Sequence, residues 1–150
     1  MTRRATSSDS AIIAEFNAAM AKETENLELN REHLQKGTDA LIADSSKGIY
    51  FLAETDGKIV GQLMITYEWS DWRNATFWWI QSVYVQPEYR KQGIFRSLYR
   101  YVESIARNRG DVCGLRLYVD QSNKHAQQTY EALGMKRSHY QMMDVDFVLK

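Results

Sequence analysis

Apolar residues recur at helical spacing in four stretches of the chain, and this pattern predicts four helices. The stretches run from the N-caps at Ser7 to Ser10 as far as Met20, from about Arg31 to Ala43, from Ile94 to Ala106, and from Ser122 or Asn123 to a stop at Gly134. Each begins or ends near residues that commonly cap helices, which supports the assignment.

Between these helices, runs of β-branched and aromatic residues predict strands. A short strand is expected at Thr2–Ala5, and a hairpin joins Tyr50–Glu54 to Ile59–Tyr67 through the turn residues Asp56 and Gly57. Residues 77–85 are apolar on both faces, as in a central strand covered on both sides. The remaining strands are expected at 115–119, near 135–137 and at 140–149.

This order of elements predicts a mixed α/β layer fold, with a sheet of about six or seven strands and about four flanking helices. The chain has 150 residues, which is close to the commonest domain size. No repeat or linker interrupts it, so we expect one domain over residues 1–150.

Composition excludes several classes of protein. Lysine plus arginine and aspartate plus glutamate both number 19, whereas a general nucleic-acid binder needs a basic excess. The chain lacks the run of about 20 apolar residues that a membrane helix requires, and its N-terminus has no apolar stretch typical of a signal peptide. One cysteine and three scattered histidines give no metal-ligand spacing. We therefore expect a cytoplasmic protein that binds no metal, membrane or nucleic acid.

The segment from Val83 to Arg96 is typical of an anion-binding turn. A buried strand leads into a loop with Pro87, and Gly93 then opens a helix. Backbone N–H groups at a helix N-terminus have no intrahelical partner and carry the positive end of the helix dipole, so they can bind phosphate oxygens. Arg90 and Lys91 add positive charge nearby. A plain connection between strand and helix explains the same residues equally well.

A second segment, Asn123–Met135, favours the binding role, because the two segments together resemble the GNAT superfamily of acetyl-CoA-dependent N-acetyltransferases. The first is similar to the family's motif Arg/Gln-x-x-Gly-x-Gly/Ala, matched by Arg90 and Gly93. The second is similar to Asn-x-x-Ala-x-x-x-Tyr-x-x-x-Gly-Phe, and the matching residues are Asn123, Ala126, Tyr130 and Gly134. The chain departs from these motifs at Phe95 and Met135.

The resemblance implies a GNAT-like fold whose sheet is splayed at its central strands, and acetyl-CoA as co-substrate. It implies that the backbone of Val83, Tyr84 and Val85 contacts the pantetheine arm, together with the Asn123 side chain. It further implies a pyrophosphate site formed by Arg90, Lys91, Gln92, Gly93, Ile94, Phe95 and Arg96. Tyr130 is implied to protonate the departing thiolate, a role that suits a phenol with a pKa near 10. Helical periodicity alone favours a core position for Tyr130, and the match to the family motif reverses that preference.

A third cluster supplies candidates for the acceptor site, because all four tryptophans lie between positions 69 and 79. Trp69 and Trp72 with Asp71 suit the binding of an amine through cation–π and charge contacts. Glu68 is the first candidate for the general base, acting directly or through water, and Asp71 is the second. The same cluster also fits a cap over the sheet edge or a dimer contact.

The predicted function is therefore transfer of an acetyl group from acetyl-CoA to a primary amine of a small molecule or peptide, by direct attack in a ternary complex. Two alternatives remain open at this stage. One is a non-catalytic domain that binds or senses acyl-CoA, and the other is a partner-binding domain that uses the tryptophans. A homodimer is compatible with each.

Overall fold

The structure is a computed structural model that describes residues 1–149. The chain forms two compact units, Met1–Arg116 and a second unit that begins at Leu117. The first unit contains β1 (Thr2–Arg4), α1 (Ser10–Glu25), α2 (Arg31–Ala43), β2 (Ile49–Thr55), β3 (Lys58–Ser70), β4 (Ala75–Val85), α3 (Ile94–Asn108) and β5 (Val112–Arg116). The second unit contains α4 (Lys124–Ala132).

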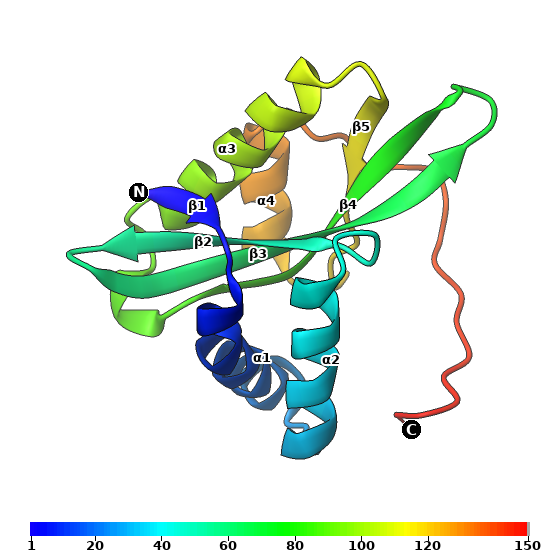
Figure 1. Ribbon diagram of the computed structural model, residues 1–150. Helices are drawn as coiled ribbons and strands as arrows, with labels where there is room; N and C mark the ends of the chain where they lie inside the picture. Colours follow the sequence, from blue (N-terminus) through cyan, green and yellow to red (C-terminus); the bar gives the residue numbers. More distant parts are fainter. Residues whose placement is uncertain (150) are drawn as a thin grey trace. The chain divides into compact units, whose positions relative to one another are not determined.

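The sheet of the first unit has five strands in the order β1-β2-β3-β4-β5. Neighbours from β1 to β4 are antiparallel, whereas β4 and β5 are parallel and are connected through α3. Helices α1 and α2 cover one face of this sheet and α3 covers the other (Figure 1). Leu52 and Leu63 from the strands and Leu98 and Val102 from α3 are completely buried, so the apolar stripe of α3 packs on the sheet as its spacing predicts.

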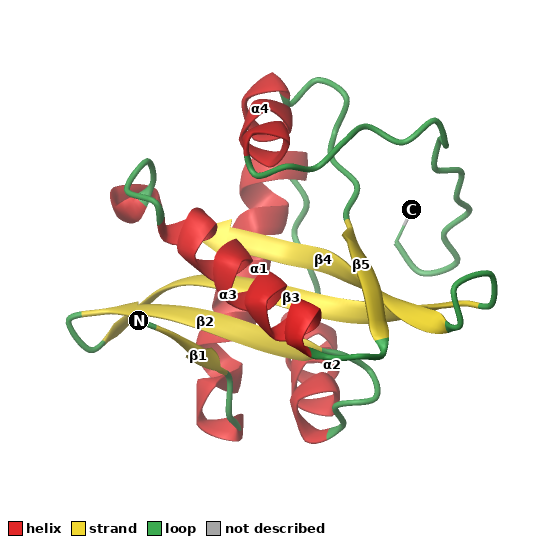
Figure 2. Ribbon diagram, turned by 90° about the horizontal axis from the view of Figure 1, so that it is seen from above, coloured by secondary structure: helices red, strands yellow, loops and turns green. Residues whose placement is uncertain are grey.

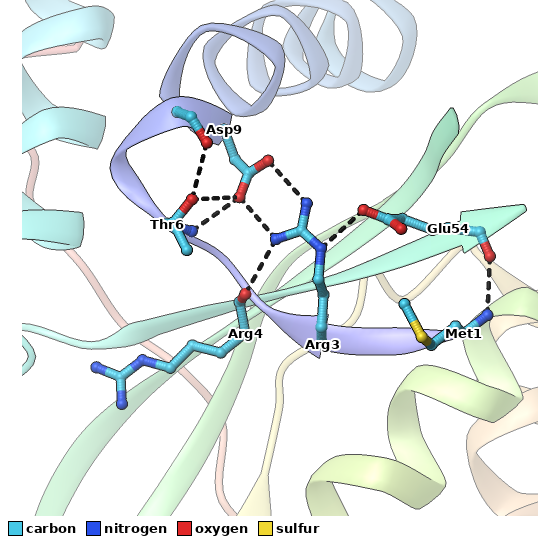
Figure 3. A network of polar contacts seen from close by, with 7 residues as sticks. Met1, Arg3, Arg4, Thr6, Asp9 and Glu54 are labelled. Atoms are coloured by element: carbon cyan, nitrogen blue, oxygen red, sulfur yellow. Dashed lines mark hydrogen bonds and ion pairs between the residues drawn. The ribbon is translucent and has the colours of Figure 1, made fainter. Parts of the chain in front are cut away.

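A polar network fixes the N-terminal strand to its neighbours (Figure 3). Two nitrogens of Arg3 donate to the two carboxylate oxygens of Asp9 at 2.8 and 2.9 Å, and its Nε donates to Glu54 at 2.7 Å. The backbone N–H of Thr6 also donates to Asp9, at 2.8 Å. Because these donors favour the ionised carboxylate, they lower the pKa of Asp9 to about 2.

The helices and the hairpin agree with the sequence-based expectations, but the C-terminal strands do not. The expected strand at 115–119 is shifted to Val112–Arg116, because its pairing with β4 ends where Trp79 meets Arg116. The stretches near 135–137 and at 140–149 contain no strand among the described residues, and Figure 2 draws this segment as loop. The described sheet therefore has five strands rather than six or seven.

Local hydrogen bonds explain why the alternating pattern after residue 140 does not produce a strand. One carboxylate oxygen of Asp146 accepts from the backbone N–H groups of Val148 and Leu149, each at 2.7 Å. The Ser138 hydroxyl likewise accepts from the backbone of Tyr140 at 3.0 Å. Such side-chain contacts compete with a strand ladder for the same backbone donors.

Candidate active site

Strand β4 contains a bulge within the stretch expected to contact the cofactor. Gln62 of β3 pairs with Tyr84, and Met64 pairs with Gln81, so Ser82 and Val83 together oppose a single residue of β3. Ser82 adopts a left-handed conformation, with a φ of 51°. A bulge of this kind bends the strand and withdraws backbone groups from the regular ladder.

The same end of β4 has an open edge on the side of β5. Pairing with β5 ends at Trp79, while β4 continues to Val85 without a partner strand on that side in the described chain. Unpaired backbone groups along a strand can bind an extended ligand as if it were an added strand. Val83 and Val85, the predicted pantetheine contacts, lie along this part of β4.

Helix α3 begins just beyond this edge, at a glycine that has no side chain to cap the first turn. Gly93 is the N-cap residue, with a φ of 81° that favours glycine, and its carbonyl accepts from Ser97 at 3.0 Å. Gly93 makes no side-chain cap, and the first turn of α3 carries the positive end of the helix dipole. This turn has the geometry of an anion site.

A glycine in β3 allows the helix start to lie close to the sheet. A Cβ atom on Gly61 would lie 3.0 Å from Cγ2 of Ile94 and 3.3 Å from the carbonyl oxygen of Tyr84. These distances are tighter than ordinary side-chain contacts, so a larger residue would push the helix start away. Gly61 thus helps to place the anion-binding turn beside the bulged strand.

Arg90 is engaged in contacts within the protein. Both of its terminal nitrogens contact the carboxylate of Glu23 on α1, and its Nε donates to the carbonyl of Val85 at 2.8 Å. Its guanidinium also lies over the Tyr84 ring, 5.4 Å from the centroid. Arg90 lowers the pKa of Glu23 by hydrogen bonding. The side chain therefore ties the loop to α1 and β4, whereas those of Lys91 and Arg96 are exposed.

The second unit contains the other predicted cofactor residues. Asn123 is the N-cap of α4, and its side-chain oxygen accepts from the backbone N–H of Ala126 at 3.1 Å. Tyr130 is half-buried, and burial raises the pKa of its phenol. Beyond α4, Gly134 has a φ of 103°, as expected for its role as the C-terminal stop. Tyr130 thus remains protonated at neutral pH.

On the first unit, Glu68 forms a polar cluster with two residues from neighbouring strands. Its carboxylate accepts from Nε1 of Trp79 at 2.9 Å and from Arg116 at 2.8 Å. The hydrogen bond from Trp79 is the main cause of a lowered Glu68 pKa. Because a general base works best with a pKa near the operating pH, these contacts make Glu68 a weak proton acceptor. They suit a permanently ionised carboxylate.

The structure does not gather the predicted acceptor residues around Glu68. Trp69 follows Glu68 in β3 and therefore points to the opposite face of the sheet. The exposed fractions of Trp69 and Trp72 are 61% and 86%, and Asp71 is exposed in the turn between β3 and β4. Trp78, by contrast, is a core residue with 3% exposure.

The described residues hold no group of three or more histidine, cysteine, aspartate or glutamate residues placed to bind a metal ion. Among the same residues, every helix is too short or too polar to cross a membrane.

A bulged central strand with an open edge, followed by a glycine-opened helix, is the architecture of acetyl-CoA-dependent N-acetyltransferases. Comparison with known proteins agrees: residues 14–135 match the model of the Acetyltransferase (GNAT) family. The chain belongs to this family.

Individual relatives extend the comparison. A thialysine N-epsilon-acetyltransferase of Bos taurus is 36% identical over 77 residues, which span 51% of this chain and 44% of the relative. The crystal structure of a possible acetyltransferase from Clostridium difficile 630 is 45% identical, with a TM-score of 0.91 and coverage of 99% of this chain and 98% of that one. A predicted acetyltransferase from Clostridium acetobutylicum, determined with acetyl-CoA, shares the fold at 15% identity, a TM-score of 0.78, and coverage of 99% and 96%.

Sequence analysis did not find three residues that shape this region. Glu23 contacts Arg90 across 67 positions of sequence, Gln62 contacts Ser82, and Arg116 contacts Glu68. A glutamine and an arginine within apolar strands are signals that could have marked Gln62 and Arg116. Nothing in the local sequence of α1 distinguishes Glu23 from other surface acids.

Proposed function

We propose that this protein transfers the acetyl group of acetyl-CoA to a primary amine of a small molecule or peptide. The observation that carries the proposal is the succession, at one end of β4, of the bulge at Ser82 and Val83 and the first turn of α3, which Gly93 opens. The first suits an amide-rich pantetheine chain, and the second suits a pyrophosphate.

The residues proposed to hold acetyl-CoA are those of the two motif segments, Val83–Arg96 and Asn123–Met135. Backbone groups of Val83, Tyr84 and Val85 bind the pantetheine arm, and the Asn123 amide contributes a further contact. Backbone N–H groups from Lys91 to Arg96 bind the pyrophosphate, with the Lys91 and Arg96 side chains adding charge. Arg90 supports the loop through Glu23 and Val85. Because the family match crosses the boundary between the units, we also propose that they form one domain over residues 1–150.

In the proposed reaction, acetyl-CoA supplies an activated acetyl thioester, which the deprotonated amine attacks directly. A backbone N–H of the β4 bulge stabilises the negative charge that develops on the thioester oxygen. Tyr130 donates its phenolic proton to the departing sulfur, and burial supports this role by keeping the phenol protonated. This route requires no covalent intermediate on the protein.

For the acceptor, we propose that Glu68 attracts the ammonium form of the amine and receives its proton through water. The lowered pKa of Glu68 supports the first role more strongly than the second. Trp69, Asp71 and Trp72 lie on an exposed strand end and turn, so we propose that they contact an extended acceptor such as a peptide. A small amine would leave these side chains largely in solvent.

The test is an assay of thiol release from acetyl-CoA with a panel of amines. The panel contains thialysine, which the bovine relative's name suggests, together with lysine, spermidine, an aminoglycoside and a peptide with a free N-terminus. We expect release above the hydrolysis background with at least one member, and mass spectrometry should find one added acetyl group on that amine. If the protein binds acetyl-CoA but acetylates no member, the proposed acceptor class is wrong.

A further inference from the structure

Four polar residues from four different elements meet beneath the β4 bulge. Nε2 of Gln62 donates to Oδ1 of Asn17 at 2.9 Å and to the backbone carbonyl of Ser82 at 3.0 Å. Nδ2 of Asn17 donates to the Tyr50 hydroxyl at 2.9 Å, and that hydroxyl lies next to the Ser82 side chain. The contacts form a ring through α1, β2, β3 and β4 that closes on Ser82.

This ring lies inside the core. Gln62 has an exposed fraction of 0%, Tyr50 of 5% and Asn17 of 7%. Oε1 of Gln62 is buried without a hydrogen-bond partner among the described residues. Buried polar atoms without partners destabilise a fold, so Gln62 is a costly residue at this position, and only the two hydrogen bonds from its Nε2 offset that cost.

The ring holds Ser82 in a backbone conformation that residues other than glycine rarely adopt. Ser82 has a φ of 51°, in the left-handed region, and such a conformation persists only when the surrounding structure enforces it. The ring holds this residue through the hydrogen bond from Gln62 to its carbonyl, and the Tyr50 hydroxyl lies next to its side chain. Restraining Ser82 also sets the direction of the next peptide group, which carries the N–H of Val83.

We infer that Gln62, Asn17 and Tyr50 are positioning residues, which hold the β4 bulge so that its backbone groups are aligned for acetyl-CoA. The inference rests on the proposed function in one respect only, which is that this part of β4 binds the thioester end of acetyl-CoA. The mechanical part, that the ring fixes the bulge, stands on the contacts themselves.

The experiment compares the wild type with Gln62→Met, Tyr50→Phe and Ile65→Val. Gln62→Met keeps the side-chain length and removes both hydrogen bonds of Gln62. Tyr50→Phe removes the hydroxyl from the polar ring and keeps the aromatic side chain. Ile65→Val is the matched control, since Ile65 is fully buried in the same strand as Gln62 and takes no part in these hydrogen bonds. Amide hydrogen exchange of residues 83–85 and calorimetric affinity for acetyl-CoA are measured on each.

We expect Gln62→Met to speed exchange at residues 83–85 at least tenfold and to weaken acetyl-CoA binding about tenfold. Tyr50→Phe should give smaller changes in the same directions, and it decides the question if Gln62→Met does not fold. Ile65→Val should change neither the exchange rate nor the affinity by more than twofold, even if it lowers the melting temperature as much as the ring variants do. Exchange in the ring variants that equals that of Ile65→Val would overturn the inference.

The outcomes also separate this inference from the proposed function. If the wild type does not bind acetyl-CoA, the proposed function fails, while faster exchange in Gln62→Met still supports the mechanical part. If the wild type binds acetyl-CoA and Gln62→Met loosens the bulge without weakening binding, the proposed link between the ring and acetyl-CoA is wrong.

Discussion

Among single residues, Tyr130 has the most direct proposed part in the chemistry. Burial raises the pKa of its phenol, so the proton that it donates is present throughout the neutral range. A general acid typically contributes at least about 100-fold to a rate. Tyr130→Phe should therefore lower the turnover number about 100-fold while leaving the dissociation constant for acetyl-CoA within about threefold.

Two measurements check this prediction. Steady-state turnover and calorimetric titration with acetyl-CoA are compared for the variant and the wild type, and Tyr118→Phe, an exposed tyrosine in the same unit, serves as the control. The turnover of the wild type should show no loss from deprotonation of Tyr130 below a pH of about 10. Unchanged turnover in Tyr130→Phe would remove this residue from the proposed role.

Asp9 governs stability in acid rather than catalysis. Its pKa is about 2 in the folded protein and 3.8 in the reference state, so its contribution is complete above the reference pKa and is lost as the pH falls from about 4 to about 2. At neutral pH this difference corresponds to about 2 kcal/mol. Asp9→Asn should lower the free energy of unfolding by that amount at pH 7.

Urea unfolding at several pH values tests this expectation. Glu15→Gln is the control. Glu15 and Arg31 form an ion pair in which both side chains are exposed, so the pair should contribute less than about 1 kcal/mol to the free energy of unfolding. The gap between wild type and Asp9→Asn should narrow as the pH approaches 2. A gap that stays constant from pH 7 to pH 2 would show that ionisation of Asp9 is not its source.

At the scale of elements, the contact between Glu23 and Arg90 links α1 to the loop that precedes α3. Both side chains are about two-fifths exposed, so the pair should contribute less than about 1 kcal/mol to stability. Its effect on the loop should be larger, because Arg90 also contacts Val85 and the Tyr84 ring. We expect Glu23→Gln to weaken acetyl-CoA binding by about 1 kcal/mol, or about fivefold.

Calorimetry on Glu23→Gln and on Glu28→Gln provides the comparison. Glu28 pairs with Lys22 at the surface and does not contact the loop, so its replacement should leave the affinity unchanged. Tighter acetyl-CoA binding by Glu23→Gln would contradict the bracing role, because it would mean that Arg90 binds the pyrophosphate once Glu23 releases it.

Helices and strands were predictable where the sequence shows both a regular hydrophobic period and residues that mark the two ends of the element. The helix at 31–43 and the hairpin through Asp56 and Gly57 are examples. A strand at 140–149 was predicted wrongly, because alternation describes one face of a strand and does not supply a partner for its backbone. The bulge at Ser82 was not predictable either, since serine has no preference for the left-handed region and is held there by residues distant in sequence.

At the scale of the whole molecule, the sequence motifs for the cofactor fall on both compact units. Arg90 and Gly93 belong to the first unit, whereas Asn123 and Tyr130 belong to the second. The motif spacing was sufficient to predict the family, which the match over 14–135 confirms. The acceptor was not predictable to the same degree, because Glu68 is engaged by Trp79 and Arg116 through contacts that only the folded sheet creates.

Every proposed role in catalysis requires that the protein bind acetyl-CoA, and a calorimetric titration of the chain measures this binding. CoA and ATP are the comparators, because CoA shares the pantetheine arm and the pyrophosphate, whereas ATP lacks the arm. We predict one site that binds acetyl-CoA and CoA with dissociation constants in the micromolar range and does not bind ATP at these concentrations. No heat of binding at millimolar acetyl-CoA would contradict the account.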